Sequence, residues 1–346
     1  MKRILSLLLA TLLALGLLAG CASEPAGGTV RIAGIKGPTS MGLSYLFTQS
    51  DEGKTKNQYE YTLVSAADEV TAQLIKGELD LAALPTNVAA TLYNKTEGKI
   101  RLVAVNTLGV LYIVTKGETI SSIDDLAGKT IYAAGQGSTP EYALDYILSE
   151  NGIDADVVFK TEQAEVATLL ASEEQAIALL PQPFVAATMA QNPDVQIALD
   201  ITEEWEKVAG EGASLTMGCI AARSEWVEEN EETLDIFLDE YKESIDYVTG
   251  NTDEAAALIA GLDIVAEPVA KAALPYCNIV FLEGDEMRSV AENTLTVLFN
   301  ANPDSVGGTM PGDDFYYTPA QEEAAGVVAI NAMVATRQYA DSIRAA

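Results

Sequence analysis

The feature that most constrains the fold is a weak internal repeat. Residues 74–90 read as a helix end, an acidic turn, an apolar strand, a Leu-Pro pair and a helix start, and residues 170–187 read the same way. A strand running into a glycine-rich turn precedes each copy, with turns at 34–40 and 134–140. Alternating strands and helices are typical of α/β folds with a largely parallel sheet. The repeat therefore predicts two similar α/β lobes.

Hydrophobic patterning predicts the elements of these lobes. Because ligands of open α/β sheets bind beyond the carboxyl ends of the strands, two lobes facing each other at those ends would enclose a cleft. The expected strands are 29–35, 79–84, 102–106, 109–115, 130–134, 176–180 and 215–221. The expected helices are 41–49, 68–76, 141–151, 164–172, 225–249, 252–262, 265–274, 284–300 and 319–341.

The first 20 residues have the pattern of a bacterial lipoprotein signal peptide. Two cations precede an apolar run at 4–18, and the segment ends Leu-Ala-Gly before Cys21. The run is short for a membrane span of about 20 residues, and small residues before the cysteine are typical of a cleavage site. We expect residues 1–20 to be removed, Cys21 to carry lipid and residues 21–28 to form a tether. The protein would then be extracytoplasmic and lipid-anchored to the cell membrane of a bacterium.

The charge of the chain excludes some partners. Its net charge is −31 at pH 7, and loss of residues 1–20, which carry two cations and no acid, makes it −33. Nucleic-acid phosphate would be repelled by this surface, and anionic lipid headgroups would not be attracted to it. Membrane contact would then depend on acyl chains on Cys21. No nucleic acid is expected as a partner, and the protein is expected to be a monomer.

The chain has no histidine and only three cysteines, which include Cys21. The lack of histidine excludes Ser-His-Asp and Cys-His catalytic sites and the common His-based zinc sites. The carboxylates are numerous but scattered, mostly on expected helix faces. We therefore expect no enzymatic activity, no metal and no cofactor. Cys219 and Cys277 lie in apolar stretches and are expected to be buried free thiols, with a disulfide as the alternative that export would permit.

The paired turns supply a first group of candidate ligand-binding residues. Each turn precedes an expected helix, whose free N–H groups and positive dipole end favour an anion. Ser138 and Glu141 have the spacing of a capping box, and Pro140 fits the first helical turn. Helix capping without a ligand is the alternative. The candidates from these turns are Lys36, Thr39, Ser40, Gln136, Ser138 and Thr139.

A second group of candidates follows the Leu-Pro pairs or flanks the first passage between the lobes. The polar members offer neutral hydrogen bonds, and Phe184 could stack on a flat ligand. Turn chemistry and core packing are the alternatives. Lys36 is the one cation in the turns, where it would either neutralise an anionic ligand or be exposed. The second group consists of Thr86, Asn87, Asn106, Tyr112, Gln182 and Phe184.

Between the two copies of the repeat, residues 122–132 contain the run Asp-Leu-Ala-Gly-Lys. Together with the lipobox and the paired turns, this run resembles the substrate-binding lipoproteins of ABC importers, and more narrowly their nitrate, sulfonate, taurine and thiamine-precursor group. The resemblance covers nearly the whole mature chain. It implies a type II periplasmic-binding-protein fold, with two α/β lobes around a central ligand cleft joined by two hinge crossings.

The resemblance also implies a division of the chain. The hinge crossings are expected near 109–114 and 215–221. The first lobe would comprise residues 29–112 and 220–346, and the second lobe residues 113–219.

These features predict a receptor that captures a small solute and delivers it to an ABC permease and ATPase complex. Because the turns contain few cations, a monoanion or a small neutral heterocycle fits better than a multiply charged ligand. A sensor that reports ligand occupancy to a membrane signalling partner is one alternative. An enzyme of thiamine-precursor metabolism is another, but such synthases take product atoms from a histidine, which this chain lacks.

Overall fold

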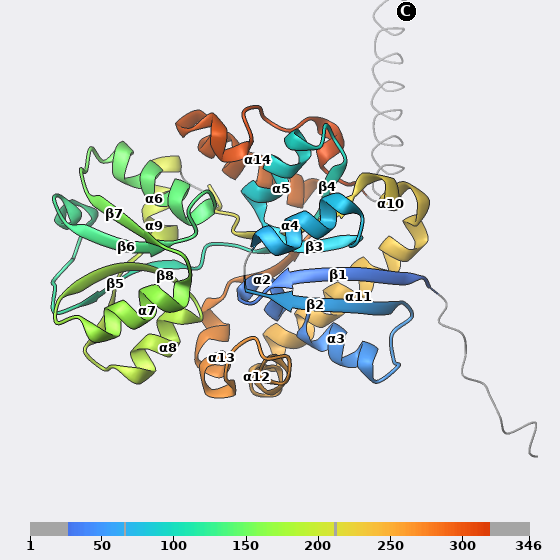
Figure 1. The fold of residues 1–346 in the computed structure, drawn as a ribbon, viewed down its shortest axis with the longest axis horizontal. Helices are drawn as coiled ribbons and strands as arrows, with labels where there is room; N and C mark the ends of the chain where they lie inside the picture. The colour runs from blue at the N-terminus through green and yellow to red at the C-terminus, as the bar shows by residue number, and fades with distance from the viewer. Residues whose placement is uncertain (1–26, 66, 211–212, 319–346) are drawn as a thin grey trace, which may run out of the picture.

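A computed structural model describes residues 27–65, 67–210 and 213–318. Within these residues the chain forms two β-sheets, each with helices on both faces (Figure 1). We define the first lobe as the six-stranded sheet with its helices, and the second lobe as the five-stranded sheet with its helices. The expected signal peptide, Cys21 and the expected helix at 319–341 lie outside the described residues. In the described part of the chain, no helix is both long enough and apolar enough to cross a membrane.

The first sheet has the strand order β11-β4-β10-β3-β1-β2. Strand β1 is parallel to β2 and β3, whereas β10 lies antiparallel between β3 and β4. The strands are β1 (Thr29–Ile35), β2 (Gln58–Val64), β3 (Leu81–Pro85), β4 (Ile100–Thr107), β10 (Gly218–Arg223) and β11 (Ile279–Leu282).

The second sheet repeats this arrangement with the order β7-β6-β8-β5-β9. Strand β6 is parallel to β7 and β8, and β5 lies antiparallel between β8 and β9. The prediction of two similar α/β lobes is therefore confirmed. The strands are β5 (Leu111–Lys116), β6 (Thr130–Ala134), β7 (Asp156–Lys160), β8 (Ala176–Pro181) and β9 (Val195–Asp200).

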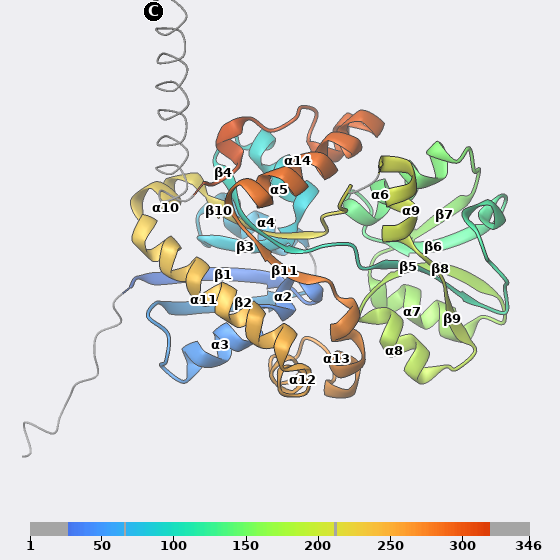
Figure 2. The ribbon, with the colours of Figure 1, turned by 180° about the vertical axis from the view of Figure 1, so that it is seen from behind.

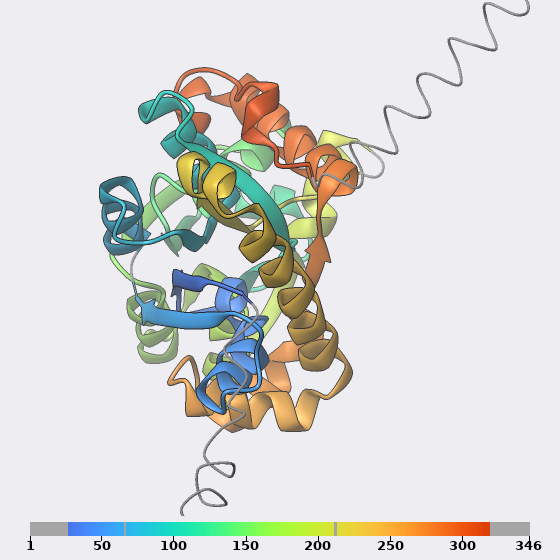
Figure 3. The same cartoon turned by 90° about the vertical axis from the view of Figure 1, so that its right-hand side faces the viewer.

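Alternating side chains of the first sheet pack into two apolar clusters. Val30 and Ile32 of β1 face the cluster under α2, α3 and α10 to α13, whereas Ala33 faces the cluster under α4, α5 and α14. Figure 3 shows the long helix α11 running beside the first sheet. The helices are α2 (Pro38–Met41), α3 (Ser44–Asp51), α4 (Ala67–Lys76), α5 (Thr86–Lys95), α10 (Ser224–Glu229), α11 (Glu231–Gly250), α12 (Thr252–Gly261), α13 (Glu267–Ala273) and α14 (Gly284–Ala301).

The second sheet is covered by α6 and α9 on one face and by α7 and α8 on the other. The cluster under α6 and α9, which contains Leu144 and Trp205, continues into the first lobe at Leu295 and Leu298 of α14. The two lobes therefore share one apolar cluster on this side, and on the other side α8 contacts α13. The helices are α6 (Thr139–Glu150), α7 (Gln163–Ser172), α8 (Phe184–Gln191) and α9 (Ile201–Ala209).

The chain passes from the first sheet to the second between β4 and β5 and returns between α9 and β10 (Figure 2). Strand β4 ends at Thr107 and β5 begins at Leu111, which pairs with Pro181 at the end of β8. Strand β10 begins at Gly218, which pairs with Pro85 at the end of β3. The carboxyl ends of the parallel strands in the two sheets therefore face each other across both passages.

The elements that were not expected as strands are β2, β7, β9 and β11, which lie at the sheet edges. An edge strand buries only part of its surface, and in β2 buried and exposed residues are mixed, so no continuous apolar run marks it. The single helix expected at 225–249 is interrupted at Asn230, between α10 and α11. The helix expected at 41–49 is preceded by the short helix α2, and α3 begins only at Ser44.

Candidate functional site

Buried neutral side chains gather at the facing ends of the two sheets. Each has a hydroxyl or an amide group, and none carries a charge. Buried polar groups need hydrogen-bond partners, so this concentration distinguishes the region from an ordinary core. The residues, all no more than 3% exposed, are Ser40, Thr86, Asn87, Asn106, Thr107, Thr139, Gln182, Thr216 and Ser305.

Helices α5, α6 and α8 begin at these same ends. Thr86 starts α5 directly after β3, Thr139 starts α6 after the turn that follows β6, and Phe184 starts α8 after β8. The first N–H groups of a helix lack intrahelical partners, and its positive dipole end favours a negative charge. Helix α2, expected to supply a comparable terminus, has only four residues. The arrangement suits an anion that accepts hydrogen bonds from several helix starts.

Asn87 and Thr139 join the two lobes directly. Thr139 Oγ1 donates a hydrogen bond to Asn87 Oδ1 at 3.1 Å. Asn87 Nδ2 donates to the backbone oxygen of Ser305 at 3.0 Å and to that of Gly137 at 3.4 Å. Asn87 is 1% exposed and Thr139 is fully buried. These two candidates therefore come together, and they contact each other.

In the first lobe, Asn106 connects the end of β4 to the turn after β1. Its Nδ2 donates to the backbone oxygen of Thr39 at 3.0 Å, and its Oδ1 accepts from Thr107 Oγ1 at 2.9 Å. Asn106 thereby fixes the backbone of the turn that carries Thr39. The Thr39 side chain itself lies against Gly218, where β10 begins.

The turn after β1 does not cap its helix through a side chain. Helix α2 begins at Pro38, its N-cap is Gly37, and no side chain caps it. Ser40 lies inside this helix, fully buried, and its hydroxyl has no hydrogen-bond partner. A Cβ added to Gly34 would lie 2.2 Å from Ser40 Oγ, so only glycine leaves room for this hydroxyl against β1.

The capping box expected at Ser138 and Glu141 is also not formed. Ser138 is the N-cap of α6, but its hydroxyl donates back to the Gly135 oxygen at 2.6 Å. The Glu141 carboxylate accepts from the Gly137 backbone N–H instead. A proline does occupy the first turn of α6, as expected. Positive φ angles at Gly135 and Gly137 bend the turn, and Gln136 between them is exposed.

Thr86 is fully buried beside Cys219 on β10. Its hydroxyl has no oxygen or nitrogen partner. Burial raises the pKa of the Cys219 thiol, and contact with the Thr86 hydroxyl acts in the opposite direction. Burial also raises the pKa of Cys277, to about 12. Both thiols are free, as expected, and they lie in different apolar clusters.

The candidates after β8 and in β5 lie on the second lobe. Gln182 Oε1 accepts from the Ala186 N–H at 3.3 Å, within the start of α8. Phe184 is partly buried and packs against the apolar cluster that contains Tyr112. Burial, followed by the nearby Asp200 carboxylate, raises the pKa of Tyr112 to about 12. Both aromatic rings therefore contribute to the core of this lobe.

Lys36 is neither free nor fully exposed. Its Nζ lies 2.7 Å from Asp263 Oδ2, in the turn between α12 and α13. Asp263 is 95% exposed at its side chain, and the hydrogen bond from Lys36 lowers the pKa of the Asp263 carboxyl. Lys36 is the only cation in the described turns that directly follow β1, β3, β6 and β8. The positive field at the facing ends therefore comes mainly from helix N–H groups.

Four buried residues near these ends were not expected from the sequence, namely Thr107, Thr216, Thr294 and Ser305. The Thr216 N–H donates to Thr294 Oγ1 at 3.0 Å, which donates to the Ser214 oxygen at 2.6 Å. Ser305, on the 3₁₀ helix η3 (Pro303–Val306), binds Asn87 from 218 residues away. The sequence around Ser305 indicates only a turn. Among the described residues, no group of His, Cys, Asp or Glu side chains is arranged to hold a metal ion.

Comparison with known proteins identifies a matching sequence family. Residues 43–234 match the profile described as the phosphonate periplasmic substrate-binding protein of ABC transporters. This match spans more than half of the chain. No curated protein matches the sequence.

Solved structures resemble the fold over most of the chain. An ABC transporter protein from Parabacteroides distasonis has a TM-score of 0.70 at 20% identity, covering 84% of this chain and 98% of its own. The Escherichia coli periplasmic aliphatic sulphonate binding protein has a TM-score of 0.66 at 17% identity, covering 84% and 92%. A Candida albicans protein described as having the generic periplasmic binding protein fold has a TM-score of 0.56 at 15% identity, covering 82% and 99%. The predicted two-lobe binding-protein fold is confirmed.

Proposed function

Because the chain belongs to the family of phosphonate periplasmic substrate-binding proteins of ABC transporters, we propose that it binds a small monoanion with a phosphonate-like or sulfonate-like head between its lobes. The observation that carries the proposal is the set of buried hydroxyl and amide groups at the facing sheet ends. A tetrahedral oxyanion accepts several hydrogen bonds at once, and helix N-termini stabilise it. The starts of α5, α6 and α8 lie at these ends.

The charge of the site favours one negative charge on the ligand. The buried side chains at the facing ends are neutral, and Lys36 is paired with Asp263. A buried charge without a counter-ion is costly unless hydrogen bonds surround it. Helix N-termini supply partial positive charges, which suit a monoanion better than a dianion. A structural neighbour is named as an aliphatic sulphonate binding protein, which agrees with this ligand class.

We assign the ligand contacts to groups whose hydrogen-bonding capacity is least used within the protein. These are the hydroxyls of Thr39 and Thr86, the amide of Gln182 and the backbone N–H of Gln136, whereas the N–H groups of Gly137 and Ser138 already donate to Glu141 and Gly135. Phe184 and Tyr112 would form an apolar wall for a substituent on the oxyanion. Membership of the narrower nitrate, sulfonate, taurine and thiamine-precursor group is part of this proposal.

Calorimetry with defined probes tests the ligand class. Ethanesulfonate is a monoanion at all working pH values, sulfate is a dianion of similar geometry, and a hydroxymethyl-aminopyrimidine is a neutral heterocycle. Ethanesulfonate should bind and raise the melting temperature by mass action. Tight binding of sulfate, or binding of the heterocycle alone, would contradict the proposal. Mass spectrometry of ligand released on denaturation would identify the natural solute.

We further propose that the protein delivers its solute to an ABC permease and ATPase while anchored by lipid on Cys21. The support is the lipobox ending at Cys21 and the transporter family of the chain. Replacing Cys21→Ser should move the protein from the membrane fraction to the soluble or secreted fraction. Unchanged fractionation of this variant would contradict the anchor. Deletion of the gene for its permease partner should abolish uptake of the solute if the protein serves transport.

A further inference from the structure

The side chain of Asn87 connects three elements from both lobes. It lies on α5 and binds the Ser305 oxygen of η3 in the first lobe, and the Gly137 oxygen and the Thr139 hydroxyl in the second lobe. A carboxamide has two N–H donors and one carbonyl oxygen. Both donors of Asn87 are therefore used, and its oxygen already has a partner. Little hydrogen-bonding capacity remains for a ligand.

We propose that Asn87 is a clamp that holds the two lobes together before any ligand binds. In this role Asn87 is a positioning residue, because it brings the starts of α5 and α6 together without contacting the solute. The clamp itself is independent of ligand identity. Its effect on affinity rests on the proposed function.

Burial makes the clamp effective. Asn87 is 1% exposed and Thr139 is fully buried, so their hydrogen bond is shielded from water while the lobes are closed. Hydrogen bonds in such surroundings are electrostatically stronger than bonds in water. On opening, water would satisfy the same groups, so the net bias toward closure is moderate. A loss of about tenfold in the ratio of closed to open protein is expected when the bond is removed.

The first-lobe side of the clamp is held in place by α5 itself. Asn94, two turns after Asn87, donates to the Val306 oxygen at 2.7 Å and to the Thr309 oxygen at 2.7 Å. These bonds fix the segment that contains Ser305, and all of them lie within the first lobe. Asn94 is therefore a matched control, since it has the same side chain, helix and partner segment, and its hydrogen bonds stay within the first lobe.

The clamp would act on affinity through the population of the closed state. If only closed protein binds tightly, the apparent dissociation constant is the intrinsic constant divided by the closed fraction. A clamp that raises this fraction tightens binding of any solute that fits. Its loss should weaken binding by up to about tenfold, and the effect should be similar for every bound sulfonate.

The test measures the distance between the two lobes in ligand-free protein. Spin labels at Glu97→Cys on the first lobe and Glu150→Cys on the second, in a protein that also carries Cys21→Ser, would report the interlobe distance. Both positions are exposed, and the native Cys219 and Cys277 are buried. Asn87→Ala and Thr139→Val should each lengthen this distance and increase the radius of gyration in solution scattering. The double variant should lengthen it no further than the single variants, and Asn94→Ala should not change it.

The possible results test the clamp and the proposed ligand class independently of each other. Unchanged ligand-free distances in both Asn87→Ala and Thr139→Val would overturn the clamp. Weaker ethanesulfonate binding with unchanged ligand-free distances would also overturn it, and would make Asn87 a ligand contact. Longer distances in variants of a protein that binds no anion would support the clamp and reject the proposed ligand class. Thr139→Val keeps the test valid if Asn87→Ala does not fold.

Discussion

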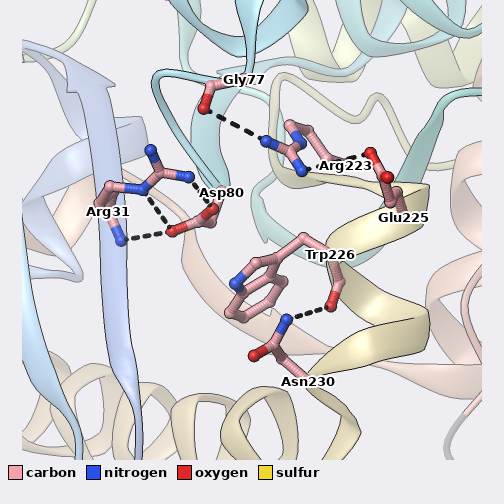
Figure 4. Close-up of polar contacts among 7 residues, drawn as sticks. All are labelled: Arg31, Gly77, Asp80, Arg223, Glu225, Trp226 and Asn230. Carbon is pink, nitrogen blue, oxygen red and sulfur yellow. Dashed lines mark hydrogen bonds and ion pairs between the residues drawn. The ribbon is translucent and has the colours of Figure 1, made fainter.

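The two ends of the first sheet bury polar groups of different kinds. At the end away from the second lobe, Asp80 is only 3% exposed at its side chain and is held by Arg31 (Figure 4). The Arg31 Nε and backbone N–H donate to Asp80 Oδ2 at 2.9 and 3.0 Å, and its Nη2 donates to Oδ1 at 2.5 Å. Nearby, Arg223 donates to the Gly77 oxygen at 3.2 Å. The end facing the second lobe instead buries hydroxyls and amides.

We infer that the end with the Arg31–Asp80 pair serves stability and that the facing end serves the proposed ligand binding. The Asp80 carboxylate has its hydrogen bonds satisfied by Arg31, and the backbone of Asp80 bonds both Arg31 and Arg223, so the pair connects β1, β3 and β10. At the facing end, the hydroxyls of Ser40 and Ser305 are buried without a partner. Unpaired buried groups lower stability, and groups of this kind are available to a ligand. On the proposed function, the first sheet is stabilised at one end and offers hydrogen-bonding groups to a ligand at the other.

The largest expected effect is a loss of stability at the charged end of the first sheet, which is the end that holds the Arg31–Asp80 ion pair. Arg31→Ala would leave the Asp80 carboxylate buried without its counter-ion. Breaking a buried ion pair costs about 3–5 kcal/mol, and we expect about 3 kcal/mol because Arg31 is 38% exposed and partly screened by water. Urea unfolding would measure the loss. The affinity of the folded protein for ethanesulfonate should not change.

An exposed ion pair provides the control for this variant. Lys54 lies 2.5 Å from Glu52, and both side chains are about half exposed, at 60% and 48%. Exposed pairs contribute little to stability, so Lys54→Ala should leave the urea midpoint unchanged. If Arg31→Ala behaved like Lys54→Ala, the charged end would not be the stabilising one. If Arg31→Ala changed the affinity for ethanesulfonate rather than the stability, the roles that we assign to the two ends of the sheet would be wrong.

The next largest effect is on binding, at the facing end. Thr86→Val combined with Gln182→Ala removes one proposed contact from each lobe. A buried ligand oxygen left without its donor costs about 1–3 kcal/mol, so ethanesulfonate affinity should fall by about tenfold to a hundredfold. Calorimetry would measure this fall. Thr115→Val, a buried position near the other end of β5, should leave affinity unchanged. Native affinity in the double variant would remove both residues from the site.

The strands inside the two sheets are predictable from the sequence because they depend on local hydrophobic patterns. The strands at 29–35 and 130–134 were predicted to the residue, since each lies inside a sheet and ends at a turn. Strand β2 was missed, because it lies at an edge, where Tyr59 is buried between the exposed Gln58 and Glu60. Hydrophobic patterns in the sequence therefore predict central strands well and edge strands poorly.

The candidate site was predictable only in part. Asn87 and Thr139 were expected at the facing ends, and they meet there. Their bond to each other depends on how the lobes are oriented, which no local pattern encodes. The partner of Lys36 lies 227 residues away, and Ser305 lies 218 residues from Asn87. Such pairs arise from tertiary packing, so the sequence showed which groups were available but not which of them were already occupied.

A smaller effect, on the free energy of unfolding, is expected at Ser40, whose hydroxyl has no hydrogen-bond partner. Ser40→Ala removes a fully buried oxygen that forms no hydrogen bond. Because no bond is lost, the free energy of unfolding should stay the same or rise by up to about 1 kcal/mol. Thermal unfolding of the ligand-free protein would measure the change. Marked destabilisation would mean that Ser40 is as well satisfied as the groups at the charged end.

The smallest effect concerns the one cation at the facing end. Asp263→Asn removes the carboxylate that Lys36 contacts at 2.7 Å. The released ammonium group should strengthen the field at the site, so ethanesulfonate affinity should rise slightly at low salt. Ions screen exposed charges over about 10 Å at 0.1 M, so the gain should disappear at high salt. Calorimetry at two salt concentrations would measure both effects. Asp253→Asn, which removes the partner of Lys271 between the neighbouring helices α12 and α13, should change neither.

The same pair predicts a pH dependence with a definite sign. Lys36 lowers the pKa of Asp263 in the folded protein. The ion pair therefore persists above the ordinary carboxyl pKa and is lost as the pH falls through the lowered value. Ethanesulfonate remains a monoanion throughout, so the affinity of the native protein should approach that of Asp263→Asn in this acidic range. Equal affinities of the two proteins at neutral pH and low salt would show that Lys36 does not contribute to the field, and that the facing end binds anions through neutral groups alone.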